Sequence, residues 1–510
     1  MSGWYAAAPL IVAMATAAAT TLAHAMPRTQ RALSLVGIFV LLATSIALMD
    51  AVWRGGMIVV QSSSWDAPFG ITLAVDTFGA VMTLIAAITG AACLTFAIPE
   101  IEERHRRAWF HPLSHVLLLG VCGAFITGDL FNLYVWFEVM LIASFGLMTI
   151  GGTKAQTDGA VKYVSLNLVA TLLFLLAVGL LYGMTGTLNY ADLSRTIPKV
   201  GNTGVLTAAA MLLMAAFGMK AAVFPLFFWL PAAYHTPLVS VSAVFAGLLT
   251  KVGVYALIRV FTLIFTGDTG FTHEILLWVS ALTMLTGVLG AAAQTEFRKI
   301  LSFHIISQIG YMTLGLALYT TLGLMGGVFY LVHHIIVKAN LFLIAGAIER
   351  AGGSFHLKKL GGLYTSLPLL GVLFLIPALS LAGLPPLSGF WSKFTVIKAS
   401  LDAGHVVLAA TGLIVGLLTL YSMLKIWNET FWKAAPVGAA ATVRDWRADR
   451  RTRLLMLTPI AALAAVTLTI GLYAEPFVDF SLRAGAQLLD KSVYIDAIFG
   501  TPAQFAEANP

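Results

Sequence analysis

The chain has 510 residues, of which 59% are hydrophobic and only 10% are charged. Soluble domains carry about 25% charged residues, and the mean hydropathy here is +0.90, so a soluble enzyme and a disordered chain are excluded. The net charge of +7 comes from 30 Lys and Arg against 23 Asp and Glu. These basic residues lie mostly in short loops, which indicates a membrane topology signal and no nucleic-acid partner.

Apolar segments long enough to span a bilayer recur along the whole chain. A spanning helix needs about 20 mostly apolar residues, and fourteen segments of the sequence meet this requirement. We therefore expect an all-α polytopic membrane protein with about 14 transmembrane helices. The predicted spans are 4–25, 32–53, 70–97, 112–128, 131–151, 160–184, 203–228, 238–262, 274–294, 300–320, 323–348, 364–397, 405–432 and 454–473.

The basic residues also predict the orientation of the chain. One alternating set of loops holds 18 Lys and Arg, the other loops, segment ends and tail hold 7, including Arg259, and 5 lie inside spans. Because cytoplasmic loops are enriched in Lys and Arg, both termini are expected on the extracytoplasmic side. The basic loop 433–453 is predicted to be cytoplasmic and to face lipid headgroups. The tail after Leu472 is predicted to form an interfacial helix or to dock on a partner subunit.

Motifs for soluble chemistry do not occur in the sequence. It has no nucleotide-binding loop after a strand, no HExxH, no CxxC and no serine elbow. Cys93 and Cys122 lie inside apolar segments and are predicted to be buried, without a disulfide. We expect no cofactor and no metal site, and an ion gradient across the membrane as the energy source.

Ionisable residues inside the predicted spans are the first candidate site. Glu138 lies in the middle of the fifth span, where a charge costs about 3 kcal/mol unless it is paired or hydrated. Asp129, at the start of the same helix, is a candidate for its N-cap. Lys220 lies deep in the seventh span, and Pro225 follows it and is expected to break the helix. A broken helix beside a charge is typical of ion sites in transporters.

Further cations lie in the eighth and eleventh spans. Lys251 is midway through the eighth span, and His333, His334 and Lys338 share the eleventh. His334 and Lys338 are four residues apart and therefore lie on one helical face. No carboxylate or thiol accompanies them in that span, which disfavours a metal site. A buried lysine can release its proton whereas arginine cannot, so the pattern favours proton transfer.

A second broken span contains Lys393, which follows Pro385 and Pro386. It lies five spans after the span of Lys220, so the two run in opposite directions, as in inverted repeats. We predict two inverted five-helix repeats, spans 4–8 and 9–13, each with a broken helix at its fourth member. Lys425, in the thirteenth span, lies toward the basic side of the membrane and is predicted to reach the interface there.

The predicted repeats divide the chain into four parts. Residues 1–110 hold the first three spans, 111–262 the first repeat and 263–433 the second repeat, and 434–510 hold the basic loop, the last span and the tail. The loops are too short for a second folded domain.

Several motifs around these residues carry a resemblance to a known family. They are Asp129-Leu-Phe-Asn-Leu with Phe137-Glu138-Val, Gly218-Met-Lys220 through Phe228-Trp-Leu-Pro231, Leu248-Leu-Thr-Lys251, Ser307-Gln-Ile-Gly310, and Gly383-Leu-Pro-Pro386 through Lys393-Phe. Over roughly residues 70–430 the chain resembles the antiporter-like membrane subunits shared by respiratory complex I and the multi-subunit Mrp sodium/proton antiporters. Within that superfamily it is most similar to the D-type subunits of the Mrp antiporters.

The resemblance implies a proton-translocating subunit of an Mrp-type Na⁺/H⁺ antiporter in a bacterial inner membrane. Its partners would be subunits A, B, C, E, F and G, together with H⁺, Na⁺ and membrane lipids. The resemblance further implies that Glu138 pairs with Lys220, and that Lys251, His334 and Lys393 continue the proton path.

One position departs from the family pattern. Several complex I relatives carry a histidine where this chain has Gln308, and His304, one turn earlier, is the candidate to replace it.

Other functions fit the same spans. The alternative is an antiporter-like subunit of a redox-driven complex, either complex I or a membrane hydrogenase. A stand-alone carrier for an organic substrate belongs to a different class, and the row of lysines argues against it. A purely structural subunit is the fourth hypothesis, which full activity after replacement of Lys220 would favour.

Overall fold

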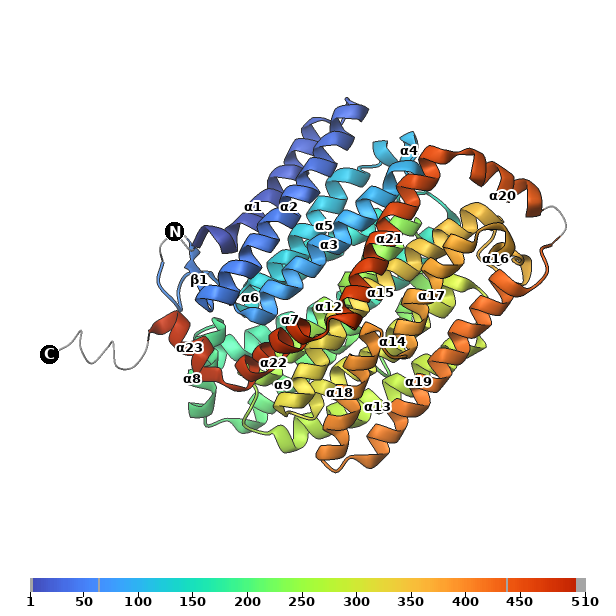
Figure 1. Cartoon of the computed structure of the whole chain (residues 1–510). Coiled ribbons are helices and arrows are strands. Elements are labelled where there is room, and N and C mark those ends of the chain that lie inside the picture. Colours follow the sequence, from blue (N-terminus) through green and yellow to red (C-terminus); the bar gives the residue numbers. More distant parts are fainter. Residues whose placement is uncertain (1–2, 63–64, 437–438, 501–510) are drawn as a thin grey trace.

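Long helices that lie side by side make up most of the molecule (Figure 1). The computed structural model describes residues 3–62, 65–436 and 439–500. The first half contains α1 (Gly3–Leu22), α2 (Pro27–Gly55), β1 (Ile58–Gln61), β2 (Thr72–Val75), α3 (Thr77–Glu100), α4 (Glu103–Arg107), α5 (Phe110–Ile126), α6 (Leu130–Thr149), α7 (Lys154–Thr185), α8 (Tyr190–Thr196), η2 (Ile197–Lys199), α9 (Thr203–Ala221), α10 (Trp229–Ala233), α11 (Val239–Val244), the π-helical turn η3 (Phe245–Leu249) and α12 (Thr250–Leu263).

The regular elements of the second half are all helices in its described part. It contains α13 (Thr269–Ala293), α14 (Phe297–Ala317), α15 (Thr321–Gly352), η4 (Leu357–Lys359), α16 (Leu363–Ser366), α17 (Pro368–Ala382), α18 (Ser388–Asp402), α19 (Val406–Trp427), the π-helical turn η5 (Asn428–Trp432), α20 (Ala439–Ala448), α21 (Arg450–Leu472), α22 (Glu475–Leu489) and α23 (Lys491–Phe499). The elements α4, α16 and α20 lie at one end of the bundle, and β1, α8 and α23 lie at the other (Figure 1).

The helices confirm a polytopic membrane protein that is mostly helical. Twelve of the described helices are long and apolar enough to cross a membrane, with α11, η3 and α12 counted as one helix, Val239–Leu263. Two shorter apolar helices, α5 and α17, overlap the remaining predicted spans. The number of fourteen requires both of them to be spans and therefore stays a prediction.

The segment before α3 differs from the expected helix at 70–97. Residues of β2 pair with β1 in an antiparallel ladder, with Ile58 opposite Val75. Both strands are rich in β-branched residues, which favour extended structure. Asp76 then begins α3, because its side chain accepts a hydrogen bond from the amide of Gly79 at 2.9 Å and so forms an N-cap.

The centre of the bundle is α15, in which residues 323–348 are all buried. It packs against α14, α18, α21, α22, α17 and α11. Helices α2, α7 and α19 instead expose large apolar side chains, among them Phe39, Leu172 and Leu417. This distribution fits a protein whose outer surface is solvated by lipid while its polar residues face inward.

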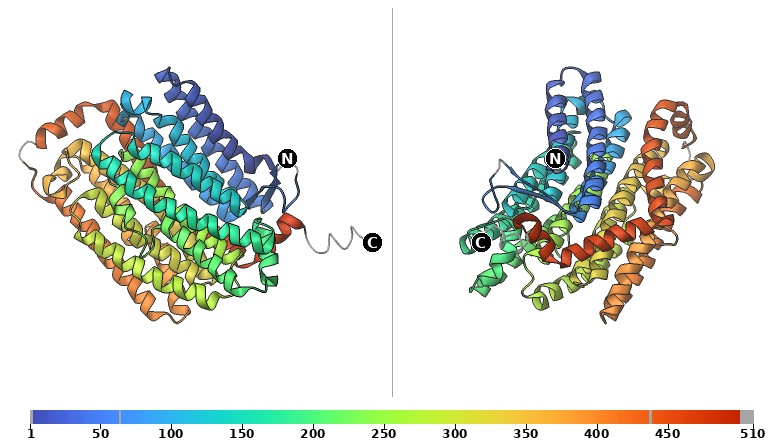
Figure 2. Two further views of the ribbon diagram at one scale, coloured as in Figure 1. Left: turned by 180° about the vertical axis from the view of Figure 1, so that it is seen from behind. Right: turned by 60° about the vertical axis from the view of Figure 1, so that its left-hand side comes forward.

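The C-terminal segment packs on its own chain, and the interfacial or partner-bound tail stays a prediction. Helix α22 contacts α15, α3 and α12 and runs across the long helices (Figure 2, right). A Cβ added to Gly485 would lie 2.9 Å from the backbone nitrogen of Met325, so only glycine allows this approach. Arg483 Nη1 also donates to the carbonyl of Trp53 at 2.7 Å.

A buried ion pair joins the start of α3 to the end of α12. Arg259, which the sequence places among the charges at segment ends, is instead only 3% exposed. Its Nη1 and Nη2 contact Asp76 Oδ2 and Oδ1 at 2.7 and 2.8 Å. Arg259 Nη2 also donates to the Tyr255 hydroxyl at 3.0 Å, and that hydroxyl donates to the carbonyl of Phe125 at 2.9 Å. The pair therefore links three helices at one end of the bundle.

We expect Asp76→Ala to destabilise the protein strongly. Breaking a buried pair leaves an uncompensated charge, at a cost of about 3–5 kcal/mol. The melting temperature of the purified protein in detergent measures the effect. Asp50→Ala is the matched control, because Asp50 forms an exposed pair with Arg54 at 2.8 Å, and exposed pairs contribute little. Equal melting temperatures for the two variants would contradict the assignment.

Candidate functional site

The first predicted site lies where the seventh span is interrupted. Helix α9 ends at Ala221, and Ala222 adopts a left-handed conformation with φ of +63°. The turn that contains Pro225 then leads to α10. The break leaves backbone groups without helical partners, and side chains bind them: Trp229 Nε1 donates to the carbonyl of Met219 at 3.0 Å. The Lys220 side chain therefore lies in the last turn of a helix that stops inside the bundle.

A threonine hydroxyl connects Lys220 to Glu138. Lys220 is 6% exposed, and its Nζ donates to Thr171 Oγ1 at 3.3 Å. Thr171 Oγ1 in turn donates to Glu138 Oε1 at 2.7 Å. Within the described residues Lys220 and Glu138 form no direct ion pair, so the pairing that the resemblance implies is bridged. Nothing in the sequence singles out Thr171, since threonines are common in apolar helices.

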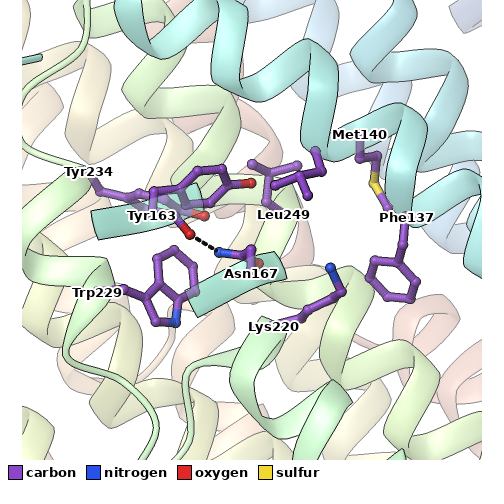
Figure 3. Close-up of a pocket in the computed structure, with 9 residues that line it drawn as sticks. Phe137, Met140, Tyr163, Asn167, Lys220, Trp229, Tyr234 and Leu249 are labelled. Carbon is purple, nitrogen blue, oxygen red and sulfur yellow. Dashed lines mark hydrogen bonds between the residues drawn. The ribbon is translucent and has the colours of Figure 1, made fainter. Parts of the chain in front are cut away.

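A small cavity lies beside the Lys220 ammonium (Figure 3). Its lining comprises Phe137, Met140, Leu141, Tyr163, Asn167, Lys220, Trp229, Tyr234 and Leu249. Figure 3 shows the Lys220 side chain pointing between Asn167 and Phe137, and Nζ lies 4.9 Å from the centre of the Phe137 ring. The cavity has a volume of about 20 Å³, which is enough for about one water molecule.

The second lysine sits directly after a π-helical turn. Helix α11 widens into η3 and then continues as α12, in which Lys251 is fully buried. Its Nζ donates to the carbonyl of Ala246 within that turn. A Cβ on Gly247 would lie 3.5 Å from the carbonyl oxygen of Ile335, so the turn packs closely on α15. Single π-turns inside α-helices are frequent at functional sites, but hydropathy does not reveal them.

The predicted histidines of α14 and α15 lie fully buried near the lysines. Neither ring nitrogen of His334 or His304 has a hydrogen-bond partner within the part of the chain that the structure describes. Lys338 Nζ donates to the carbonyl of Leu301 at 3.1 Å. His334 is within electrostatic range of Lys251 and Lys338, and His304 is within range of Lys338 and also of Lys393 and Lys425. These four side chains therefore form one group.

His333 points away from this group, toward α18. Its Nδ1 lies 2.8 Å from the Ser388 hydroxyl, at the first residue of that helix.

Gln308 of α14 binds Tyr330 of α15. The Tyr330 hydroxyl donates to Gln308 Oε1, and the Tyr330 ring stacks on Tyr311 with centroids 5.1 Å apart.

The second broken span holds Lys393. Helix α17 ends at Ala382, Gly383 has a φ of +93°, and α18 begins at Ser388, beyond Pro385 and Pro386. Lys393 Nζ reaches back across the break and donates to the carbonyls of Leu381 and Ala382 at 2.9 and 3.0 Å. The carbonyl end of a helix carries partial negative charge, so backbone dipoles stabilise the Lys393 ammonium. The Lys220 ammonium is stabilised instead by Thr171 and Glu138.

Two predicted residues lie at helix ends. Lys425 Nζ donates to the carbonyls of Ala292 and Gln294 at 2.8 and 2.6 Å, which satisfies the C-terminus of α13. Asp129 is the N-cap of α6 and accepts from the amide of Asn132 at 2.7 Å. Burial raises the pKa of Asp129, which lies in the turn before α6, to about 6, although the bond from Asn132 acts in the opposite direction.

Comparison with known proteins gives consistent results. The family described as NADH:quinone oxidoreductase/Mrp antiporter, TM, matches residues 127–419. A protein of Alkalihalophilus pseudofirmus that is named as the D subunit of a Na⁺/H⁺ antiporter is 46% identical over 93% of this chain and 94% of its own length. The protein of the same name from Bacillus subtilis is 41% identical over 88% of this chain and 90% of its own.

The fold has a close counterpart among solved structures. A chain of the Mrp complex from Dietzia sp. superposes with a TM-score of 0.86, at 36% identity, over 98% of this chain and 99% of its own. The family match covers more than half of the chain, and the relatives match almost all of it. The chain therefore belongs to the NADH:quinone oxidoreductase/Mrp antiporter family of membrane subunits.

Proposed function

We propose that the chain is a proton-translocating subunit of a multi-subunit Mrp-type Na⁺/H⁺ antiporter, and that its buried lysines and histidines carry the protons. The proposal is carried by one observation, the series of buried lysines from Lys220 to Lys393 whose ammonium groups contact neutral groups, with the buried histidines His334 and His304 among them. The names of the relatives supply the coupled ion, Na⁺. We further propose subunits A, B, C, E, F and G as partners, and a bacterial cell membrane in which both termini are extracytoplasmic.

The first step of the proposed path is a proton transfer through Thr171. Its hydroxyl accepts from the Lys220 ammonium and donates to the Glu138 carboxylate. When Lys220 gives a proton to the Thr171 oxygen, the hydroxyl can pass its own proton to Glu138. The products are a neutral amine and a carboxylic acid, so charge is conserved and no unpaired ion is left in the membrane.

The middle of the path consists of Lys251, His334, Lys338 and His304. Each of the two unpaired imidazoles has one N–H that can donate to a water molecule and one bare nitrogen that can accept a hydrogen bond or a proton. Buried polar groups are normally hydrogen-bonded, so these nitrogens favour a hydrated connection between neighbouring lysines. An imidazole can accept a proton on one nitrogen and release one from the other, which suits it to relay.

Lys393 ends the proposed path, and its binding groups suit a changing charge. The carbonyls of Leu381 and Ala382 are neutral whether the lysine is protonated or not. A carboxylate partner would be left as an unpaired buried ion each time the lysine lost its proton, at a cost of several kcal/mol. Carbonyl ligands therefore allow repeated protonation and deprotonation. We propose that residues 111–262 and 263–433 are inverted repeats that each supply one broken span to the path.

The proposed function is tested by expressing the complete gene cluster in a host without its own Na⁺/H⁺ antiporters. Addition of Na⁺ to energised inside-out vesicles should collapse the pH gradient with the wild type and not with Lys220→Ala. Full activity of an assembled Lys220→Ala variant would favour a structural subunit. A wild-type complex that assembles but ignores Na⁺ would favour a redox-driven complex instead.

The bridging role of Thr171 predicts a specific pair of results. Thr171→Val keeps the size of the side chain but removes the hydroxyl, so antiport should fall by about a hundredfold. Thr171→Ser keeps the hydroxyl and should retain most of the rate. The same vesicle assay measures both variants, and immunoblots of the assembled complex control for expression. Equal rates for the two variants would mean that protons do not pass through this hydroxyl.

The two lysines of the twelfth and thirteenth predicted spans should differ in importance. Lys393→Ala removes a residue of the path and should lower antiport by about a hundredfold or more. Lys425→Ala removes a ligand of the α13 terminus and should leave most of the antiport rate. The reverse ranking in the vesicle assay would place the end of the path at Lys425.

A further inference from the structure

The carboxylate of Glu100 binds the first turn of the helix that carries Lys251. Glu100 is the last residue of α3. Its Oε1 accepts from the amide of Val239 at 2.5 Å, and its Oε2 accepts from the amide of Ser240 at 3.0 Å. The first amides of a helix have no partner within the helix and carry partial positive charge. A carboxylate that accepts two of them makes a strong, charge-assisted contact.

This contact fixes one end of a long continuous helix. The helix Val239–Leu263 runs from the Glu100 contact through η3 into α12. Lys251 lies twelve residues beyond Val239, or about 18 Å along the axis, and its Nζ binds Ala246 inside the π-turn. A helix transmits axial displacement along its length, so the position of its first turn determines where the π-turn and Lys251 lie.

Sideways motion of the same helix is limited by α15. A Cβ on Gly346 would lie 2.5 Å from Val239 Cγ1, and one on Gly247 would lie 3.6 Å from Ala339 Cβ. The first turn and the π-turn therefore both pack on α15 without intervening space. Contact with α15 restrains the helix laterally, while Glu100 restrains it along its axis.

The other charged groups near this junction have partners of their own. Arg298 Nη1 donates to the carbonyl of Pro237 at 2.9 Å, and its Nε lies 3.7 Å from Glu296 Oε1. Glu349 is also within electrostatic range of Arg298. Among the described residues Glu100 has no ion-pair partner within 4.0 Å. Arg298 is within electrostatic range of Glu100, but the carboxylate oxygens bind the amides of the helix end directly.

We propose that Glu100 is a positioning residue for proton transfer, which holds the helix Val239–Leu263 so that Lys251 stays beside His334 and Lys338 of α15. This inference rests on the proposed function, because it assigns Glu100 a role through Lys251. Glu100 itself does not carry the proton.

Glu100→Gln tests the proposal with a minimal change of shape. The carboxamide offers one oxygen, so one of the two amides loses its acceptor and the negative charge disappears. Misplacement of Lys251 should lower Na⁺-dependent antiport by about tenfold while the amount of assembled complex stays normal. The alkaline limb of the pH profile should shift, because Lys251 changes its distance from His334 and Lys338 on α15.

Two further variants keep the experiment decisive. Asp268→Asn is the matched control, since Asp268 caps α13 by accepting from the amide of Phe271 at 3.2 Å, and it should change neither rate nor pH profile. Val239→Pro removes one donor to Glu100 without altering charge, at a first helical position where proline is well tolerated. It should shift the pH profile in the same direction as Glu100→Gln, and it decides the matter if that variant does not assemble.

The outcomes separate this inference from the proposed function. Assembled Glu100→Gln and Val239→Pro variants with the wild-type rate and pH profile would overturn the positioning role if Lys251→Ala abolishes antiport. Full activity of Lys251→Ala would instead overturn the proposed path itself, and the role of Glu100 with it.

Discussion

A charged side chain inside a bilayer must find its stabilising partner within the protein, because lipid tails supply none. In this structure the partners of the buried lysines are mostly neutral groups. Lys220 binds a threonine hydroxyl that leads to Glu138, Lys251 binds a carbonyl of a π-turn, and Lys393 binds two carbonyls at a helix end. Inside a regular helix the carbonyls are already bound by the helix's own amides, and of these lysines only Lys338 shares such a carbonyl, that of Leu301 in α14. The sites of Lys220, Lys251 and Lys393 instead coincide with irregularities in the helices.

The buried arginine shows the contrasting solution. Arg259 forms two hydrogen bonds with the Asp76 carboxylate and a third with the Tyr255 hydroxyl. Arginine stays charged at any physiological pH, so a permanent anion beside it is never left unpaired. Lysine can change its charge, and a fixed carboxylate would favour only one of its two states. The choice between Arg–Asp and Lys–carbonyl thus separates a structural ion pair from residues suited to proton transfer.

Much of this arrangement can be predicted from the sequence, because bilayer thickness and the cost of buried charge act on single segments. Hydropathy locates the spans, and Lys220 with Pro225 indicates a break. The contacts between segments are not accessible in this way. Thr171 is an ordinary residue of an apolar helix until folding places it between two charges, and the π-turn before Lys251 depends on packing against α15. The strand Thr72–Val75 is apolar, so hydropathy merges it with the following span.

The difference between the two breaks follows from which carbonyls the backbone leaves free. After α9, the carbonyl of Met219 is bound by the amide of Ala222 and by Trp229 Nε1. The Lys220 ammonium therefore turns toward Thr171 of α7, which connects it to Glu138 of α6. After α17, the amides of Gly383 and Leu384 bind the carbonyls of Leu379 and Ser380, so the next two carbonyls stay available. A lysine placed after the break can reach these two, and Lys393 does so. Placing the lysine before one break and after the other thus couples the first to a carboxylate that can take up a proton, and the second to a site that is neutral in either state.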